Sequence, residues 1–143
     1  MKTLILASLF ALGALAQESL ITRLDHVTVF VKDYDEALKW YTETLGFEKT
    51  ADQAFGKGQR WLTVAPRGQK GSEIVLAKAD GQHTELVGKQ ALWVFHTTDC
   101  QKTYEALRAR GVKFRQPPAK VGWGGQAIFE DLYGNEFVLL SDK

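Results

Sequence analysis

Hydrophobic and polar positions change their period along this chain in a fixed order. Apolar residues first alternate with polar ones over residues 26–31, as in a strand with one buried face. They then recur every three or four positions, as in an amphipathic helix, at Tyr34, Ala37, Leu38 and Tyr41. Asp33 is a natural N-cap for this helix, Glu36 completes a capping-box pattern, and Gly46 marks the end. The segment therefore predicts a strand followed by a capped helix.

The same order of elements returns 66 residues further along, where residues 92–107 lie over residues 26–41. Asp99 takes the place of the cap and Gly111 that of the terminating glycine. The second helical stripe consists of Cys100, Thr103, Tyr104 and Leu107. The strand-like sequence EIVLA at residues 73–77 also recurs, as EFVLL at residues 136–140. A shared order of strand, cap, helix, glycine and terminal strand indicates an internal duplication.

Two further strand-like runs lie between the helix and the terminal strand of each half, separated by turn-forming clusters that include QPPAK and GWGG. The expected strands are residues 47–53, 59–65, 113–116 and 125–130. Each half is thus predicted to be a βαβββ module. Module one spans about 22–79 and module two about 90–142, joined by a polar linker.

Two such modules in one short chain resemble the vicinal oxygen chelate (VOC) superfamily, which includes glyoxalase I, bleomycin resistance proteins and extradiol dioxygenases. The resemblance covers residues 24–140 and is carried by LDHVTVFVKDYDEALKWYTETLGF, ARGVKF and FEDLYGNEFVLL. It implies an α+β, glyoxalase-like fold, in which curled mixed sheets of the two modules surround a shared cavity. It also implies that two chains pair as a homodimer.

Composition narrows the class of protein further. The chain has 143 residues, 45% of them hydrophobic and 24% charged, with a net charge of +1, which fits one globular domain and argues against nucleic-acid binding. Residues 1–16, MKTLILASLFALGALA, read as a signal peptide, so residues 17–143 would form a single exported domain, periplasmic or secreted, with no membrane association after cleavage. Loss of Lys2 with the leader changes the net charge from +1 to 0. The lone Cys100 permits no internal disulfide.

The resemblance also bears on metal binding. Metal enzymes of the superfamily take their ligands from the first and last strand of each module. His26 matches one such position, whereas the other three hold Leu92, Val75 and Val138, which have no lone pair to donate. The superfamily's metal site is therefore expected to be absent, and no other cofactor is indicated.

Strand alternation still places several polar and aromatic side chains on one face, which predicts a ligand-binding surface. The candidate ligand-binding residues are His26, Thr28, Phe30, Trp61, Glu73, His96, Trp123 and Glu136. The His and Glu members admit three interpretations: a displaced metal site, acid/base or hydrogen-bonding groups, or structural residues at a wet rim. Trp93 and Phe95 are expected in the core, and His83 in solvent.

Two classes of function follow. The first is a glyoxalase- or bleomycin-resistance-like protein that binds a small molecule without the usual metal site. The alternative is a metal-dependent lyase, isomerase or dioxygenase with displaced or intersubunit ligands. The carbon side chains at the three ligand positions favour the first, and the sequence leaves open whether the protein is an enzyme.

Overall fold

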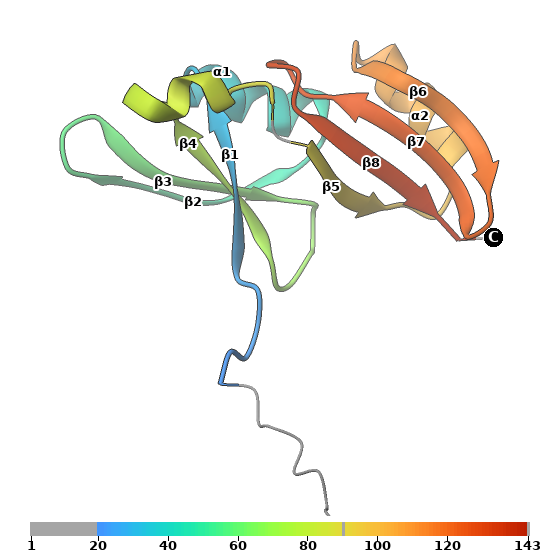
Figure 1. Cartoon of the computed structure of the whole chain (residues 1–143), viewed down its shortest axis with the longest axis horizontal. Helices are drawn as coiled ribbons and strands as arrows, with labels where there is room; N and C mark the ends of the chain where they lie inside the picture. Colours follow the sequence, from blue (N-terminus) through green and yellow to red (C-terminus); the bar gives the residue numbers. More distant parts are fainter. Residues whose placement is uncertain (1–19, 90, 143) are drawn as a thin grey trace, which may run out of the picture.

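The computed structural model describes residues 20–89 and 91–142, which form two four-stranded sheets lying side by side (Figure 1). The first sheet has the strand order β1-β4-β3-β2 and the second has the order β5-β8-β7-β6. In each sheet the first and last strands of the module pair in parallel, and the other neighbours are antiparallel. The prediction of two βαβββ modules is confirmed, and the two sheets do not close on one another (Figure 1).

The elements occur in the predicted order. Module one contains β1 (His26–Val31), α1 (Tyr34–Lys39), the π-helical turn η1 (Trp40–Thr44), β2 (Glu48–Phe55), β3 (Gln59–Ala65) and β4 (Glu73–Lys78). The linker contains a 3-10 helix, η2 (Gly81–Leu86). Module two contains β5 (Ala91–His96), α2 (Cys100–Ala109), β6 (Lys113–Val121), β7 (Gly124–Glu130) and β8 (Glu136–Ser141). The predicted signal peptide, residues 1–16, lies outside the described residues. Within the described ranges, no helix has the length and hydrophobicity needed to cross a bilayer.

Both helices begin at the predicted caps. The carboxylates of Asp33 and Asp99 each accept a hydrogen bond from the backbone N–H three residues along, at 2.9 and 3.0 Å. These hydrogen bonds hold the pKa of both carboxyl groups below the usual range. The chain leaves each helical segment through a glycine with positive φ, 86° at Gly46 and 90° at Gly111.

The Glu36 side chain does not close the predicted capping box. Its carboxylate instead accepts a hydrogen bond, 2.7 Å long, from the hydroxyl of Tyr133 in the β7–β8 turn. The same hydroxyl accepts a hydrogen bond from the Asp33 backbone N–H at 3.2 Å. Burial, and then the hydrogen bond to Glu36, raise the pKa of the Tyr133 phenol. Glu36 therefore ties the start of α1 to module two.

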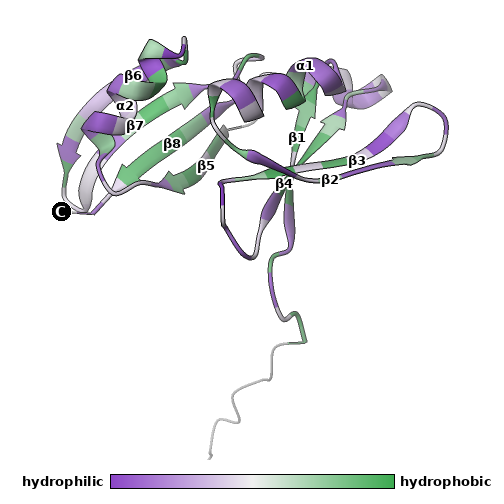
Figure 2. Cartoon of the chain, turned by 180° about the vertical axis from the view of Figure 1, so that it is seen from behind, coloured by the Kyte–Doolittle hydropathy of each residue, from purple (hydrophilic) through white to green (hydrophobic). Residues whose placement is uncertain are grey.

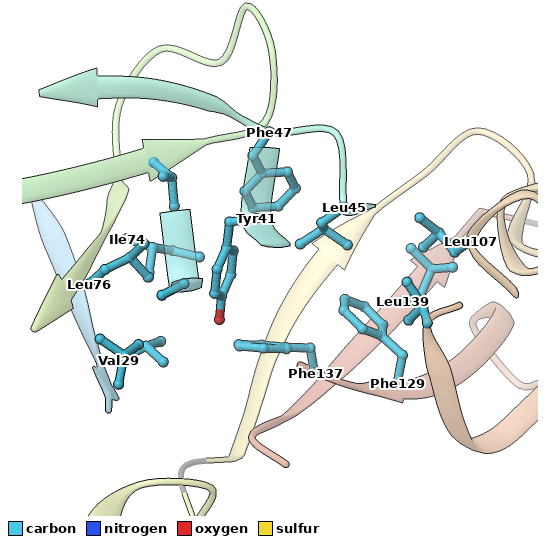
Figure 3. Packing of buried hydrophobic residues seen from close by; sticks show 14 of the residues in the cluster. Val29, Tyr41, Leu45, Phe47, Ile74, Leu76, Leu107, Phe129, Phe137 and Leu139 are labelled. Atoms are coloured by element: carbon cyan, nitrogen blue, oxygen red, sulfur yellow. The ribbon is translucent and has the colours of Figure 1, made fainter. Parts of the chain in front are cut away.

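One hydrophobic core runs through both modules (Figure 3). Phe47 of module one meets Phe95 of module two edge to face, with ring centroids 5.4 Å apart, and Phe95 lies 5.4 Å from Phe137. The fully buried Tyr41 donates its hydroxyl proton to Asp131 of module two, at 2.9 Å. The modules are thus joined by aromatic packing and one buried hydrogen bond.

The strand β6 differs from the sequence prediction, which ended it at residue 116 with a turn at the two prolines. The strand continues to Val121, with a register shift between Gln116 and Ala119 around Pro117 and Pro118. Strand β6 lies at the edge of its sheet, so the missing proline N–H groups break no ladder on the outer side.

Candidate functional site

The open face of the first sheet, the side turned away from α1, carries the clearest group of functional side chains. Backbone pairing sets His26 of β1 beside Glu73 of β4, and Thr28 beside Val75. Thr63 of β3 pairs with Val75 from the other side. Because β1 and β4 are parallel, alternate residues of the two strands share this face. The predicted cavity-facing residues of module one therefore lie on one surface.

The imidazole of His26 lies between two carboxylates. Its Nδ1 is 3.0 Å from Asp25 Oδ2 and its Nε2 is 3.5 Å from Glu73 Oε2. The His26 side chain is 26% exposed and that of Glu73 is 30% exposed, so both can reach a ligand. The arrangement can donate or accept hydrogen bonds and is suited to orienting a polar group.

A short hydrogen-bonded chain continues from Glu73 across the sheet. Thr50 Oγ1 of β2 donates to Glu73 Oε2 at 3.0 Å and lies 2.6 Å from Thr63 Oγ1. Thr63 is fully buried, and this contact satisfies its hydroxyl. The chain fixes one oxygen of the carboxylate, and no hydrogen-bond partner of Glu73 Oε1 is found in the described part of the protein.

Aromatic rings border these polar groups. Trp61 of β3 meets the His26 ring edge to face, with centroids 5.0 Å apart, and 40% of the tryptophan remains exposed. At the other end of β1, Phe30 stacks on His83 at 4.7 Å with an interplanar angle of 15°. His83, expected in solvent, is 39% exposed, and η2 also brings one face of its ring onto the sheet.

The open face of the second sheet is more apolar. Leu92 and Val94 of β5 are 53% and 60% exposed, respectively. Glu136 shares the Arg115 guanidinium with Glu130, each carboxylate 3.3 Å from Arg115 Nε. Two carboxylates thus share one guanidinium, which leaves this end of the face with one net negative charge.

The remaining His and Glu candidates do not converge. His96 lies at the far end of β5, where its Nε2 is 3.2 Å from Asp142 Oδ1. It pairs with Leu140, whereas Glu136 pairs with Ala91 at the opposite end of β8. The structure therefore brings together His26, Glu73 and Trp61, and it leaves His96 and Glu136 apart from each other.

A β-bulge refines the expected counterpart of His26. Ala91 and Trp93 pair with consecutive residues of β8, and Leu92 stands between them with a φ of 73°. Since Ala91 pairs with Glu136 as His26 pairs with Glu73, Ala91 is the structural counterpart in module two, not Leu92. Neither residue can bind a metal.

The residues of the superfamily's metal site do not fit a metal ion in this chain. Val75 and Val138 stand at the two terminal-strand positions and Ala91 at the first-strand position of module two. In residues 20–89 and 91–142, no three His, Cys, Asp or Glu side chains are grouped so that they could hold a metal ion. A single histidine ligand falls short of the three or more that protein metal sites usually supply.

Two tryptophans of module two are exposed to solvent. Trp123 stands at the tip of the β6–β7 hairpin and is 64% exposed. Trp93 shares a face with the half-buried Phe95 but is itself 38% exposed, so the expectation of a core tryptophan is wrong. The bulge at Leu92 and a shallow pocket of about 160 Å³ between the modules account for this exposure.

Sequence reasoning missed Asp25, Thr50 and Arg115. Asp25 had a visible signal, since it directly precedes His26. Thr50 joins the site through a register shift between Lys49 and Ala51, which no local pattern reveals.

Comparison with known proteins agrees with the architecture. The sequence model of the Glyoxalase/Bleomycin resistance protein/Dioxygenase superfamily matches residues 23–139. An uncharacterized protein of Shewanella frigidimarina is 36% identical over 127 residues, covering 82% of this chain and 93% of the relative. The crystal structure of UcmS2 is 40% identical with a TM-score of 0.75, covering 84% of this chain and 98% of that one.

TnmS3, an antibiotic binding protein from Streptomyces sp. CB03234, is 32% identical with a TM-score of 0.77, covering 88% of this chain and all of that one. The matched region of the superfamily model includes both α-helices, strands β1 to β7 and all but the last two residues of β8. The chain therefore belongs to the Glyoxalase/Bleomycin resistance protein/Dioxygenase superfamily.

Proposed function

We propose that this protein binds a small organic molecule on the open face of the first sheet, without the metal ion of the superfamily's metalloenzymes. The observation that carries the proposal is the exposed Trp61 ring beside the His26–Glu73 pair. An aromatic surface with a few fixed polar groups is the usual composition of a small-molecule site. The ring supplies area for an apolar ligand, and the pair supplies orientation.

The nature of the ligand follows from the same surface. Trp61 favours a planar, partly aromatic molecule, and Glu73 Oε1, which has no partner among the described residues, favours a hydroxyl or N–H group on that molecule. The relation to an antibiotic binding protein of Streptomyces supports an antibiotic-like natural product as the ligand. Valines at the two terminal-strand metal positions support binding without a metal.

A second copy of the chain would complete the site. The two sheets lie side by side, so a ligand on the first sheet is open to solvent on its other side (Figure 1). The second sheet offers exposed Leu92 and Val94 on strands that are mostly hydrophobic (Figure 2). Exposed apolar groups of this kind mark interaction surfaces. A homodimer in which each first sheet faces the partner's second sheet would bury both and enclose two equivalent sites.

The ligand claim is tested by thermal unfolding with bleomycin and a panel of aromatic antibiotics. At a concentration a hundredfold above Kd, a true ligand adds about 2.7 kcal/mol to the free energy of unfolding. Trp61→Ala and His26→Ala should each abolish the stabilisation by the active compound. The matched control is Trp93→Ala, since Trp93 is 38% exposed, close to the 40% of Trp61, but lies on the other face of its sheet.

Two outcomes contradict the proposal. One is a panel in which no compound stabilises the protein. The other is a compound whose stabilisation of the protein is reduced equally by Trp61→Ala and by Trp93→Ala. The dimer is tested separately by light scattering, in which Val94→Arg should convert the dimer to a monomer. If the wild-type protein is a monomer and still binds the compound, the site does not need a second copy.

A further inference from the structure

The internal duplication offers a comparison at the first residue of each helix. Tyr34 opens α1 and Cys100 opens α2, each directly after its aspartate cap. Strands β3 and β7 have the same length, so Gln59 and Gly124, their first residues, correspond. What fills a space in module one can thus be compared with what fills it in module two.

In module one, a phenol ring fills this space. Tyr34 is only 6% exposed, and its hydroxyl donates to Gln59 Oε1 at 3.2 Å. The same hydroxyl accepts a hydrogen bond from the Arg60 backbone N–H at 3.1 Å, and the Arg60 guanidinium lies 5.3 Å from the ring centroid. The space between the start of α1 and β3 is therefore filled by the Tyr34 side chain.

In module two, the three large side chains are replaced by small ones. Cys100 occupies the position equivalent to Tyr34, and Gly124 and Gly125 occupy the positions equivalent to Gln59 and Arg60. A groove of about 630 Å³ opens there, at the end of the second sheet where the C-terminus lies (Figure 1). This volume falls within the roughly 300–1,000 Å³ typical of ligand sites.

A polar side chain lines the groove. Ser141 of β8 is only 7% exposed as a residue, and no hydrogen bond of its hydroxyl to another described residue is found. A methyl group added to Gly125 would lie 2.8 Å from Ser141 Oγ and 3.1 Å from Cys100 Cβ, so these three residues converge at the floor. Since the described residues contain no buried side-chain oxygen without a partner, the Ser141 hydroxyl is reached by solvent and is available to a ligand.

The rim of the groove selects against a charged ligand. Lys120 contributes a positive charge, while Asp99 and Asp142 contribute negative charges. Pro118 and Val121 add apolar wall on the β6 side. Asp99 is already paired with Lys102 and Asp142 with His96, so a neutral molecule is favoured over a carboxylate or an amine.

We propose that this groove is a second binding site, separate from the open face of the first sheet, and that it takes a small neutral phenol. The ring lies in the open groove above the floor formed by Gly125, Ser141 and Cys100, with Pro118 and Val121 beside it. The hydroxyl hydrogen-bonds to Ser141 Oγ. The site is a consequence of the duplication, in which module two has lost the side chain that module one still carries.

The test is an NMR titration of the ¹⁵N-labelled protein with p-cresol, which has the shape of a tyrosine side chain, and with toluene, which lacks the hydroxyl. p-Cresol should shift the amide signals of Gly124, Gly125 and Ser141 saturably. One hydrogen bond is worth about 0.5–1.5 kcal/mol, so p-cresol should bind roughly two- to tenfold more tightly than toluene.

Two substitutions separate the parts of the proposal. Ser141→Ala should remove the preference for p-cresol over toluene, and Cys100→Tyr should refill the groove and abolish the shifts. Ser72→Ala is the matched control, because its hydroxyl is bonded to the Leu24 carbonyl, at 2.7 Å, outside the groove. It should leave both affinities unchanged.

The proposal is overturned if p-cresol leaves the Gly124 and Gly125 signals unchanged, or shifts only residues around His26 and Trp61. It is also overturned if Ser141→Ala keeps the full preference for p-cresol. If Cys100→Tyr fails to fold, the Ser141→Ala comparison decides alone. None of these results depends on whether the first sheet binds an antibiotic.

Discussion

Replacing Tyr41 by phenylalanine should cost about 1.5–3 kcal/mol of unfolding free energy, because it removes a buried hydrogen bond that joins the two modules at Asp131. Tyr41 is fully buried and its hydroxyl lies 2.9 Å from Asp131 Oδ2. Burial, and then the charge of Asp131, hold the pKa of the Tyr41 phenol well above its usual range, so the hydroxyl stays a donor. Hydrogen bonds to charged groups contribute about 1.5–3 kcal/mol.

Packing adds little to this loss, since phenylalanine keeps the ring. Asp131 also retains its hydrogen bonds from the backbone N–H groups of Tyr133 and Asn135, both at 2.9 Å, so its buried charge keeps hydrogen-bond partners. Urea unfolding followed by circular dichroism measures the change, and the slope with denaturant should stay constant. Tyr104→Phe serves as the control, because the Tyr104 hydroxyl accepts an exposed hydrogen bond from Arg108, at 3.1 Å.

A loss for Tyr41→Phe below about 0.5 kcal/mol, the usual range for surface substitutions, would refute the reasoning. A double-mutant cycle with Asp131→Asn gives a second check. The two changes should cost less together than the sum of the single changes, because each disrupts the same charge-assisted hydrogen bond. Strict additivity would show that the hydrogen bond does not form in solution.

Three further predictions concern stability and processing. Leu38→Ala should cost about 2 kcal/mol in urea unfolding, the low end for such substitutions, because Leu38 packs against the core while partly exposed; no loss would place the helical stripe on the wrong face. Asp33, Asp52 and Asp99 have a lowered pKa in the folded protein, so the stability they provide is complete above the unfolded value of 3.8. It should fall as the pH drops below that value, and a stability that rises on acidification would contradict this sign. If residues 1–16 are cleaved as the sequence predicts, N-terminal sequencing of the mature protein should begin at Gln17, and an intact Met1 would exclude cleavage.

Much of the fold was predictable because its signals are local and repeated. The helical stripes, the Asp33 and Asp99 caps and the glycines after each helix depend on residues a few positions apart, and the duplication supplied each signal twice. Strand β6 was predicted too short, because a proline pair usually marks a turn and its place at a sheet edge depends on the whole topology.

The site was less predictable, because it depends on pairing between distant segments. The partners His26 and Glu73 followed from strand alternation and the repeat. Thr50 reaches Glu73 only through an irregular register, and the stack of His83 on Phe30 depends on how the linker folds. The bulge at Leu92 shifts the counterpart of His26 by one residue, which a fixed sequence offset cannot reveal.

Titration of the purified protein with zinc, nickel, manganese and iron tests the account's central claim, binding without a metal, most directly. A true metal site gains RT ln(1 + [M]/Kd), about 4 kcal/mol when the metal exceeds Kd a thousandfold. With valines at positions 75 and 138 and His26 as the sole family ligand, we predict no change in melting temperature and no stoichiometric metal by elemental analysis. A melting temperature that rises with one of these metals, and no longer rises in His26→Ala, would contradict the account and favour a metal-dependent lyase, isomerase or dioxygenase.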